Sequence, residues 1–168
     1  MKLEQTIIIS RPADEVFAFR SLAENAPRWR GHDVLVTPPE PGEIGIGMRW
    51  TELRPTTQGG TEEWLLEITE YECGRLLGIS ATCGDTLVTE RHCFVPCEGE
   101  TRYTLTTEVH GQRPRPMVQR QTIELLLHFK WCLEQPDRKP PQMRRARPDR
   151  GGQGLVAVGT AAIPAATG

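Results

Sequence analysis

Apolar residues recur at steps of three and four positions over Arg115–Glu134, and this spacing predicts one long amphipathic helix. Prolines at its start fit a first helical turn, and Pro136 closes its far end. At about 1.5 Å per residue the helix is roughly 30 Å long, about the span of a strand of nine or ten residues. A helix with so wide an apolar face must pack against another apolar surface, and the predicted sheet provides it. The stripe consists of Val118, Ile123, Leu125, Leu126, Phe129, Cys132 and Leu133.

Alternation of apolar and polar positions predicts strands in the rest of the chain. Leu3–Ser10 is the first, and two short helices follow, one ending near Leu22 and one over about Ala23–Trp29, interrupted by Pro27. Short turns join the later strands, so these strands form an antiparallel meander. No helix is predicted between them, which excludes a doubly wound nucleotide-binding fold. They are expected at Asp33–Thr37, Met48–Arg54, Thr61–Glu72, Arg75–Cys83, Thr86–Val95 and Thr101–Val109.

The composition of the chain changes abruptly after residue 135. Residues 1–135 carry 14 Lys and Arg against 20 Asp and Glu, whereas residues 136–168 carry 6 against 2. An acidic body argues against nucleic acid as a partner. The second segment mixes proline, arginine, glycine and alanine without periodicity, which is typical of disorder. The sequence therefore predicts one domain at 1–135 and a disordered tail at 136–168.

The sequence shows no clear targeting or metal-binding signal. No apolar run approaches the roughly 18–20 residues that a membrane span needs, and Met1–Ser10 lacks the apolar centre of a signal peptide. We therefore expect a cytoplasmic protein without membrane insertion. The five cysteines are an odd number without zinc-site spacing, which favours reduced, mostly buried thiols. Neither a metal site nor a cofactor is predicted.

Several local runs of residues resemble one known family. Ile8–Phe17 (IISRPADEVF) resembles an opening in which a strand ends at a proline before the first helix, and Trp29 resembles the tryptophan after the second helix. These features are similar to those of the START/Bet v 1-like helix-grip superfamily, also called SRPBCC, in its polyketide cyclase/dehydrase-like branch. The match covers about residues 1–134. Further matching runs are Gly45–Trp50 (GIGMRW), Ile68–Glu72 (ITEYE) followed by Arg75–Leu77 (RLL), and Gly99–Arg102 (GETR).

This resemblance implies an α+β helix-grip fold. A curved antiparallel sheet of about seven strands would grip the long C-terminal helix, with two short helices after the first strand. The resemblance further implies a cavity between sheet and helix that binds a small molecule. Because the matching runs are turns and core positions, they do not transfer an activity. The superfamily includes aromatic cyclases, lipid carriers, plant ligand-binding proteins and chaperone activators.

Two residues of one predicted strand are candidates for catalysis. If Phe94 faces the helix, as the corresponding aromatic residue of the family does, strand alternation turns Glu90 and His92 to the same side. A histidine titrates near neutral pH, and burial pushes the pKa of a glutamate upward, so the pair could transfer protons in a cyclase or dehydratase. The alternative is a register shifted by one residue, or a strand that water reaches at this end.

The same alternation predicts which residues contact a ligand. Trp50 and Glu52 share one face, Trp64, Leu66 and Ile68 continue it on the next strand, and a second group lines the opposite wall. Such an aromatic stripe is also what an ordinary core looks like. On the long helix, a polar stripe that includes His128 either borders the cavity mouth or faces solvent. The predicted ligand contacts are Trp50, Glu52, Trp64, Leu66, Ile68, Phe94, Tyr103, Leu105, Thr107 and Leu125.

The predicted function is binding of a small, largely apolar molecule between sheet and helix, with aromatic and polyketide-like molecules as candidates. One hypothesis is a cofactor-independent cyclase or dehydratase that uses Glu90 and His92. The alternative hypothesis is a carrier or sensor of lipids or other hydrophobic ligands, without catalysis. A third option is an interaction module with no enclosed volume. The oligomeric state is left open.

Overall fold

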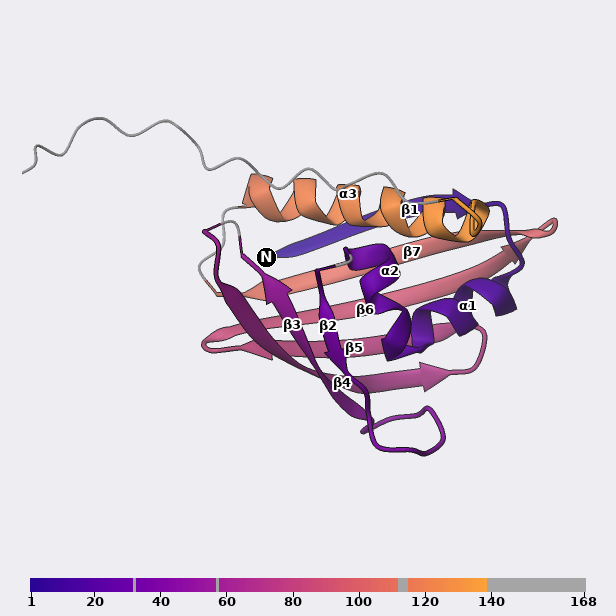
Figure 1. The fold of residues 1–168 in the computed structure, drawn as a ribbon. Coiled ribbons are helices and arrows are strands. Elements are labelled where there is room, and N and C mark those ends of the chain that lie inside the picture. The colour runs from indigo at the N-terminus through magenta and orange to yellow at the C-terminus, as the bar shows by residue number, and fades with distance from the viewer. Residues whose placement is uncertain (32, 57, 112–114, 139–168) are drawn as a thin grey trace, which may run out of the picture.

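The computed structural model describes residues 1–31, 33–56, 58–111 and 115–138, which form an α+β fold (Figure 1). Each expected strand and helix is found, with its ends moved by at most a few residues. Pro27 lies in the first turn of its helix and does not interrupt it, because a first turn tolerates proline. The elements are β1 (Lys2–Ile9), α1 (Ala13–Ser21), the 3₁₀ turn η1 (Ala23–Asn25), α2 (Ala26–Arg30), β2 (Leu35–Thr37), β3 (Arg49–Pro55), β4 (Thr61–Glu72), β5 (Leu76–Cys83), β6 (Thr86–Cys97), β7 (Glu100–His110) and α3 (Arg115–Glu134).

The seven strands form one antiparallel sheet in the order β1-β7-β6-β5-β4-β3-β2. Strands β2 to β7 pair with their neighbours in the chain, so the predicted meander is confirmed. Strand β1 pairs with β7 and thereby joins the two ends of the domain. The helix α3 lies along the β1 and β7 side of the sheet (Figure 1).

A β-bulge between Ile68 and Glu70 bends β4. Gly78 on β5 pairs with Glu70 at this bulge, and a Cβ atom built on Gly78 would lie 2.8 Å from the Cβ of Glu70 and 2.9 Å from its backbone nitrogen. Only glycine therefore allows β5 to follow the bent strand so closely. The bulge increases the curvature that closes the sheet around its helices.

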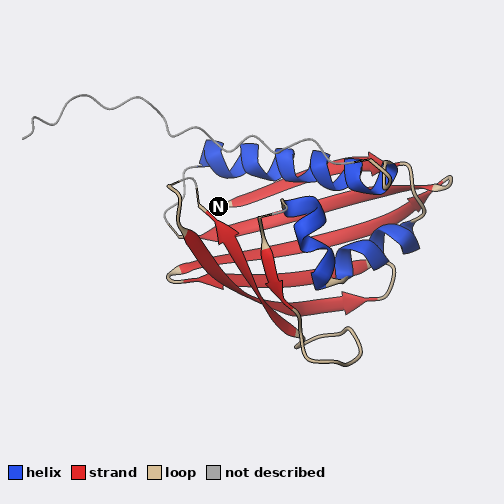
Figure 2. Cartoon of the chain, in the orientation of Figure 1, coloured by secondary structure: helices blue, strands red, loops and turns tan. Residues whose placement is uncertain are grey.

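The helices all lie on one side of the curved sheet (Figure 2). A continuous run of aromatic rings joins them across its inner face, from Phe17 on α1 through Phe94 and Tyr103 to Phe129 on α3. In each of the three successive pairs of these four rings, the centroids are 5.2 Å apart. Aromatic contacts at this distance stabilise a packed core, so the run fixes α1 and α3 against the same strands.

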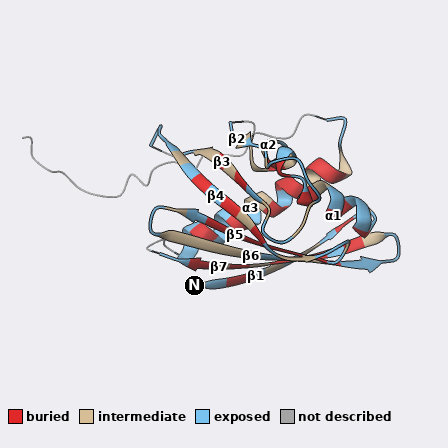
Figure 3. Cartoon of the chain, turned by 90° about the horizontal axis from the view of Figure 1, so that it is seen from below, coloured by how far each residue is buried: buried red, intermediate tan, exposed pale blue. Residues whose placement is uncertain are grey.

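Buried and exposed residues alternate along the strands in the predicted register (Figure 3). Among the described residues, no helix is long and apolar enough to cross a membrane. Of the predicted tail, Pro136–Arg138 forms a turn after α3, and residues 139–168 lie outside the described part of the chain.

Candidate ligand-binding site

The predicted ligand contacts lie on the inner face of the sheet, apart from Leu125, which is on α3. The register that turns Glu90, His92 and Phe94 inward is present, since His92 and Phe94 are 1% and 2% exposed. Glu90 and Leu125 are half-buried. The other predicted contacts are at most 6% exposed: Trp50, Glu52, Trp64, Leu66, Ile68, Tyr103, Leu105 and Thr107.

A small cavity lies beneath α3. Its free volume is about 10 Å³, room for a single water molecule. Predicted residues that line it are Glu90, His92, Tyr103, Leu105 and Leu125, and Trp29, Leu126 and Phe129 complete the wall. This cavity is therefore smaller than the ligand-sized space that the resemblance implies. The predicted contacts that do not line the cavity are Trp50, Glu52, Trp64, Leu66, Ile68, Phe94 and Thr107.

Three largely buried arginines contact Glu52 and Glu90, two of the predicted site residues. Arg20 comes from α1, Arg30 from the end of α2 and Arg54 from β3, and their side chains are 5%, 10% and 19% exposed. We had not predicted these residues as part of the site. The spacing of two of them indicated an inward position. Arg20 follows Val16 by one helical turn and so shares its buried face, and Arg54 follows Glu52 by two strand positions and so shares its face of the sheet.

These arginines alternate with two glutamates in a chain of ion pairs. Arg20 Nη2 is 3.2 Å from Glu90 Oε2, which is 3.4 Å from Arg30 Nη2. Arg30 Nε is 3.4 Å from Glu52 Oε2, and Arg54 Nη2 is 2.7 Å from the same oxygen. The chain begins and ends with arginine, so its three cations and two carboxylates carry a net charge of +1. We call these five residues the ion-pair chain.

Two tryptophans support the ion-pair chain. The guanidinium carbons of Arg20 and Arg30 lie 4.6 and 4.5 Å from the centroid of the Trp29 ring, and that of Arg54 lies 4.7 Å from the Trp64 ring. A guanidinium over an aromatic face gains cation–π attraction, which is stronger away from water. Trp29 and Trp64 therefore hold the arginines inside as well as filling volume.

The ion pairs decide the protonation state of Glu90. Burial alone would raise its pKa, but Arg30, His92 and Arg20 together outweigh burial and hold the pKa well below its usual range. The expectation that burial moves the Glu90 pKa upward toward neutrality is therefore wrong, because it did not include buried arginines. Glu52 follows the same logic, since Arg30 and Arg54 outweigh its burial and lower its pKa.

His92 is neutral at physiological pH. Burial, and then the positive charge of Arg20, lower its pKa to about 4, so it does not titrate near pH 7 as the sequence suggested. Arg20 Nη2 lies 2.9 Å from His92 Nε2, and an arginine can only donate. The proton of His92 is therefore on Nδ1, which donates to the Tyr103 hydroxyl oxygen at 2.6 Å.

This arrangement leaves hydrogen-bond donors beside the cavity. The Tyr103 hydroxyl oxygen accepts the hydrogen bond from His92 Nδ1–H, so its own O–H has no acceptor among the described residues. In the same part of the structure, Arg20 Nε and Trp29 Nε1 are buried without a hydrogen-bond partner. Buried donors without an acceptor are costly and uncommon.

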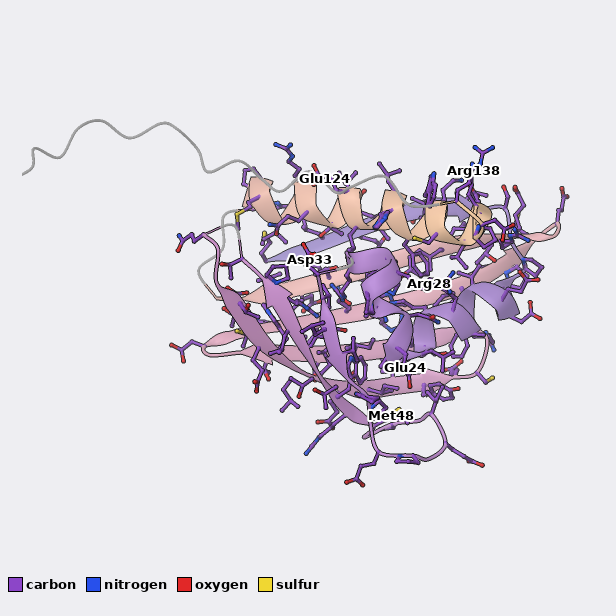
Figure 4. The ribbon with its side chains drawn as sticks, viewed as in Figure 1. Glu24, Arg28, Asp33, Met48, Glu124 and Arg138 are labelled. Atoms are coloured by element: carbon purple, nitrogen blue, oxygen red, sulfur yellow. The ribbon has the colours of Figure 1, made fainter. Side chains whose placement is uncertain are left out.

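Helix α2 is attached to α3 beside the cavity. His128 Nδ1–H donates to the carbonyl oxygen of Trp29 at 2.7 Å, and Cys132 Sγ–H donates to that of Arg28 at 3.1 Å. Arg28 is labelled on α2 in Figure 4, below α3. His128, for which the sequence left surface and cavity mouth open, is buried against α2. We call this contact the α2–α3 seam.

Among the described residues, no group of three His, Cys, Asp or Glu side chains is placed to hold a metal ion. The site instead offers hydrogen-bond donors, ion pairs and apolar walls. Such groups can bind an organic molecule, and a buried imidazole beside a carboxylate can transfer a proton.

No protein-family model and no curated protein matches the sequence. Solved structures with the same fold include protein CV1439 from Chromobacterium violaceum, with 10% identity, a TM-score of 0.68, and coverage of 79% of this chain and 96% of that one. Ara h 8.0201 has 12% identity and a TM-score of 0.62 over 79% and 97% of the two chains. The di-domain ARO/CYC StfQ from the steffimycin biosynthetic pathway has 16% identity and a TM-score of 0.67 over 80% and 46%. At these identities the likeness establishes the fold, and the predicted helix-grip architecture is confirmed.

Proposed function

We propose that this protein binds a small, largely apolar molecule between the sheet and α3, with an oxygen atom of the ligand bound to Tyr103. The observation that carries the proposal is the combination of one polar end and several apolar walls around the cavity beneath α3. Leu105, Leu125, Leu126 and Phe129 would contact the apolar body of the ligand. Binding of hydrophobic ligands is also what the resemblance to the superfamily implies.

The Tyr103 hydroxyl supplies the polar contact. Burial raises its pKa, so the O–H keeps its proton and acts as a donor at physiological pH. His92 Nδ1–H fixes the oxygen in place at 2.6 Å. A ligand carbonyl or hydroxyl that accepts the Tyr103 proton would satisfy a buried donor, which favours ligands with such an oxygen over plain hydrocarbons.

Binding requires movement, because a free volume of about 10 Å³ is far below the roughly 300–1,000 Å³ of ordinary ligand pockets. The α2–α3 seam is the part of the wall that is joined by two hydrogen bonds and one ring contact, Trp29 to Phe129 at 5.6 Å. Since α2 has only five residues, it can move without unfolding the sheet. We infer that opening of the seam admits the ligand.

Titration calorimetry with 2-acetonaphthone, a neutral aromatic ketone, tests the proposal. We expect saturable binding with a dissociation constant below about 1 mM. Leu125→Trp fills the cavity and should abolish binding, whereas Ile123→Trp, on the same helix but 38% exposed, should preserve it. No binding to the wild-type protein, or equal binding by both variants, contradicts the proposal.

The contact with Tyr103 has its own test. Tyr103→Phe removes one hydrogen-bond donor, which should weaken 2-acetonaphthone binding by about two- to tenfold. Binding of 2-ethylnaphthalene, which has a similar shape but no oxygen, should not change. Equal effects on the two compounds would assign Tyr103 to packing alone.

A second candidate function is proton-transfer catalysis of the cyclase or dehydratase type by Glu90 and His92. Their placement favours it, because Glu90 Oε2 and His92 Nε2 are 3.4 Å apart on the cavity wall. Removal of an α-proton would leave its electron pair on the ligand carbonyl oxygen, where the Tyr103 O–H could stabilise the enolate. The lowered pKa values make both groups weak bases, so binding has more support than catalysis.

Deuterium exchange into the methyl group of 2-acetonaphthone, followed by NMR in D₂O, tests this second function. The base takes one methyl proton, an enolate forms, and the solvent returns a deuteron. Catalysis predicts exchange faster than in buffer, lost in Glu90→Gln and His92→Ala while the far-ultraviolet circular dichroism spectrum is unchanged. If the ketone binds but the wild-type protein does not accelerate exchange, the carrier function stands and the catalytic one is refuted.

A further inference from the structure

We infer that the ligand is an organic anion, and that its negatively charged group binds at the Arg20 end of the ion-pair chain. This inference rests on the proposed function and specifies the chemical class of the ligand. It arises from three largely buried arginines on the inner face of the fold, which were not among the predicted site residues.

The charge of the ion-pair chain is the first argument. Its members are at most 19% exposed, and they comprise one cation more than the number of carboxylates. His92 does not change this balance, because burial and Arg20 keep it neutral. An uncompensated charge is costly in a buried site, so one additional anion would stabilise the cluster.

The position of the donors is the second argument. Arg20 is 5% exposed and Trp29 is 3% exposed, and Arg20 Nε and Trp29 Nε1 have no acceptor among the described residues. The Arg20 guanidinium lies over the Trp29 ring, and its Nη2 contacts two cavity residues, Glu90 and His92. Trp29 and Tyr103 line the cavity and Arg20 contacts other residues of its wall, so donors from all three lie on this side of the cavity.

The other end of the chain is a poorer candidate. The Arg54 side chain is 19% exposed and binds Glu52 through both Nε and Nη2, at 2.8 and 2.7 Å. Arg30 is shared between Glu52 and Glu90. Arg20 is the most buried of the three arginines, has an N–H without an acceptor among the described residues and contacts two cavity residues, which favours it as the place of the additional anion.

Calorimetric titration with a matched pair of probes tests the inference. The compounds 2-naphthoate and 2-naphthamide have nearly the same shape and differ by one negative charge. We expect the carboxylate to bind roughly tenfold more tightly or better, the ratio that one charge-assisted hydrogen bond supplies. The preference should persist at 0.5 M NaCl, because buried charges are weakly screened.

Two variants with opposite expected effects on the preference for naphthoate locate the anion site. Arg20→Met should remove the preference for naphthoate, whereas Glu90→Gln should increase it, since it removes a negative charge and keeps every arginine. Arg49→Met is the control for Arg20→Met. Arg49 also forms an ion pair with a glutamate, but its side chain is 64% exposed and lies outside the ion-pair chain. If Arg20→Met does not fold, the predicted gain in Glu90→Gln still tests the inference.

The possible results separate the two proposals. If neither probe binds, the proposed function fails and the inference falls with it. If the amide binds as tightly as the carboxylate, the proposed function stands and the inference is refuted. A preference for naphthoate that Glu90→Gln does not increase, or that disappears in 0.5 M NaCl, means that the anion binds at exposed basic residues, which also refutes it.

Discussion

The neutral state of His92 predicts how stability depends on pH. His92 has a pKa of about 4 in the folded protein, against about 6.5 for a free imidazole. Below pH 6.5 the unfolded chain therefore binds a proton that the folded protein does not, so stability falls as the pH decreases from 6.5 to 4. The groups that face His92 are Arg20, Glu90 and Tyr103. Glu90 is ionised in this range, because its pKa is lowered well below its usual value.

The size of the effect follows from these two pKa values. Between pH 7.5 and pH 5.0, protonation of His92 in the unfolded state alone removes about 2 kcal/mol from the free energy of unfolding. The non-titrating variant His92→Gln should lack this contribution, whatever its stability at pH 7.5. Other titrating groups are common to both proteins and cancel in the comparison.

Urea unfolding followed by tryptophan fluorescence measures the effect in both proteins at both pH values. The expected result is that the wild-type protein loses about 2 kcal/mol more than His92→Gln as the pH is lowered. Equal losses would refute the reasoning, because they would mean that His92 titrates normally in the folded protein. Such a result would also remove the argument for the Nδ1 tautomer and for the donor role of Tyr103.

Three further predictions test the ion-pair chain, the seam and the bulge. Arg30→Met removes the cation shared by two buried carboxylates and should lower the free energy of unfolding in urea by about 3–5 kcal/mol. Arg49→Met, at an exposed ion pair, should lower it by less than about 1 kcal/mol. Equal losses would contradict a buried network. His128→Leu removes the hydrogen bond to Trp29 and should speed 2-acetonaphthone association in stopped-flow fluorescence; an unchanged rate would exclude the α2–α3 seam as the entrance. Gly78→Ala places a Cβ 2.8 Å from Glu70 and should lower the unfolding free energy by about 1–3 kcal/mol, whereas Gly45→Ala, with no neighbour within 4 Å, should have little effect; similar losses would refute the role given to the bulge.

Local patterns predicted the strands and helices, and the family resemblance predicted how they assemble. With Phe94 facing inward, as the resemblance implied, strand alternation placed Glu90 and His92 on the same side. The three- and four-residue spacing of α3 marked its buried face. Both patterns arise because one side of each element must be removed from water. Both signals are carried by neighbouring residues, so they survive without knowledge of the tertiary structure. The bulge between Ile68 and Glu70 has no such local signal. Gly78, which pairs with Glu70 at the bulge, is on another strand, and the pairing is known only from the structure.

The candidate site was only partly predictable. Alternation placed Glu90 and His92 on the cavity side, but their pKa values depend on Arg20 and Arg30, which are 60 or more positions earlier in the chain. Arginines are ordinarily exposed, so composition gave no reason to place them inside. The same three side chains pair with Glu52 and Glu90 and so set the charge of the site.

A crystal structure of the protein grown with saturating 2-naphthoate would test the central claim most directly. The account predicts the naphthalene ring beneath α3, between Leu105, Leu125 and Phe129, with its carboxylate in hydrogen-bond contact with Arg20 and α2 displaced from α3. A naphthoate found only on the protein surface, with Arg20, Trp29 and the α2–α3 seam arranged as described above, would contradict it.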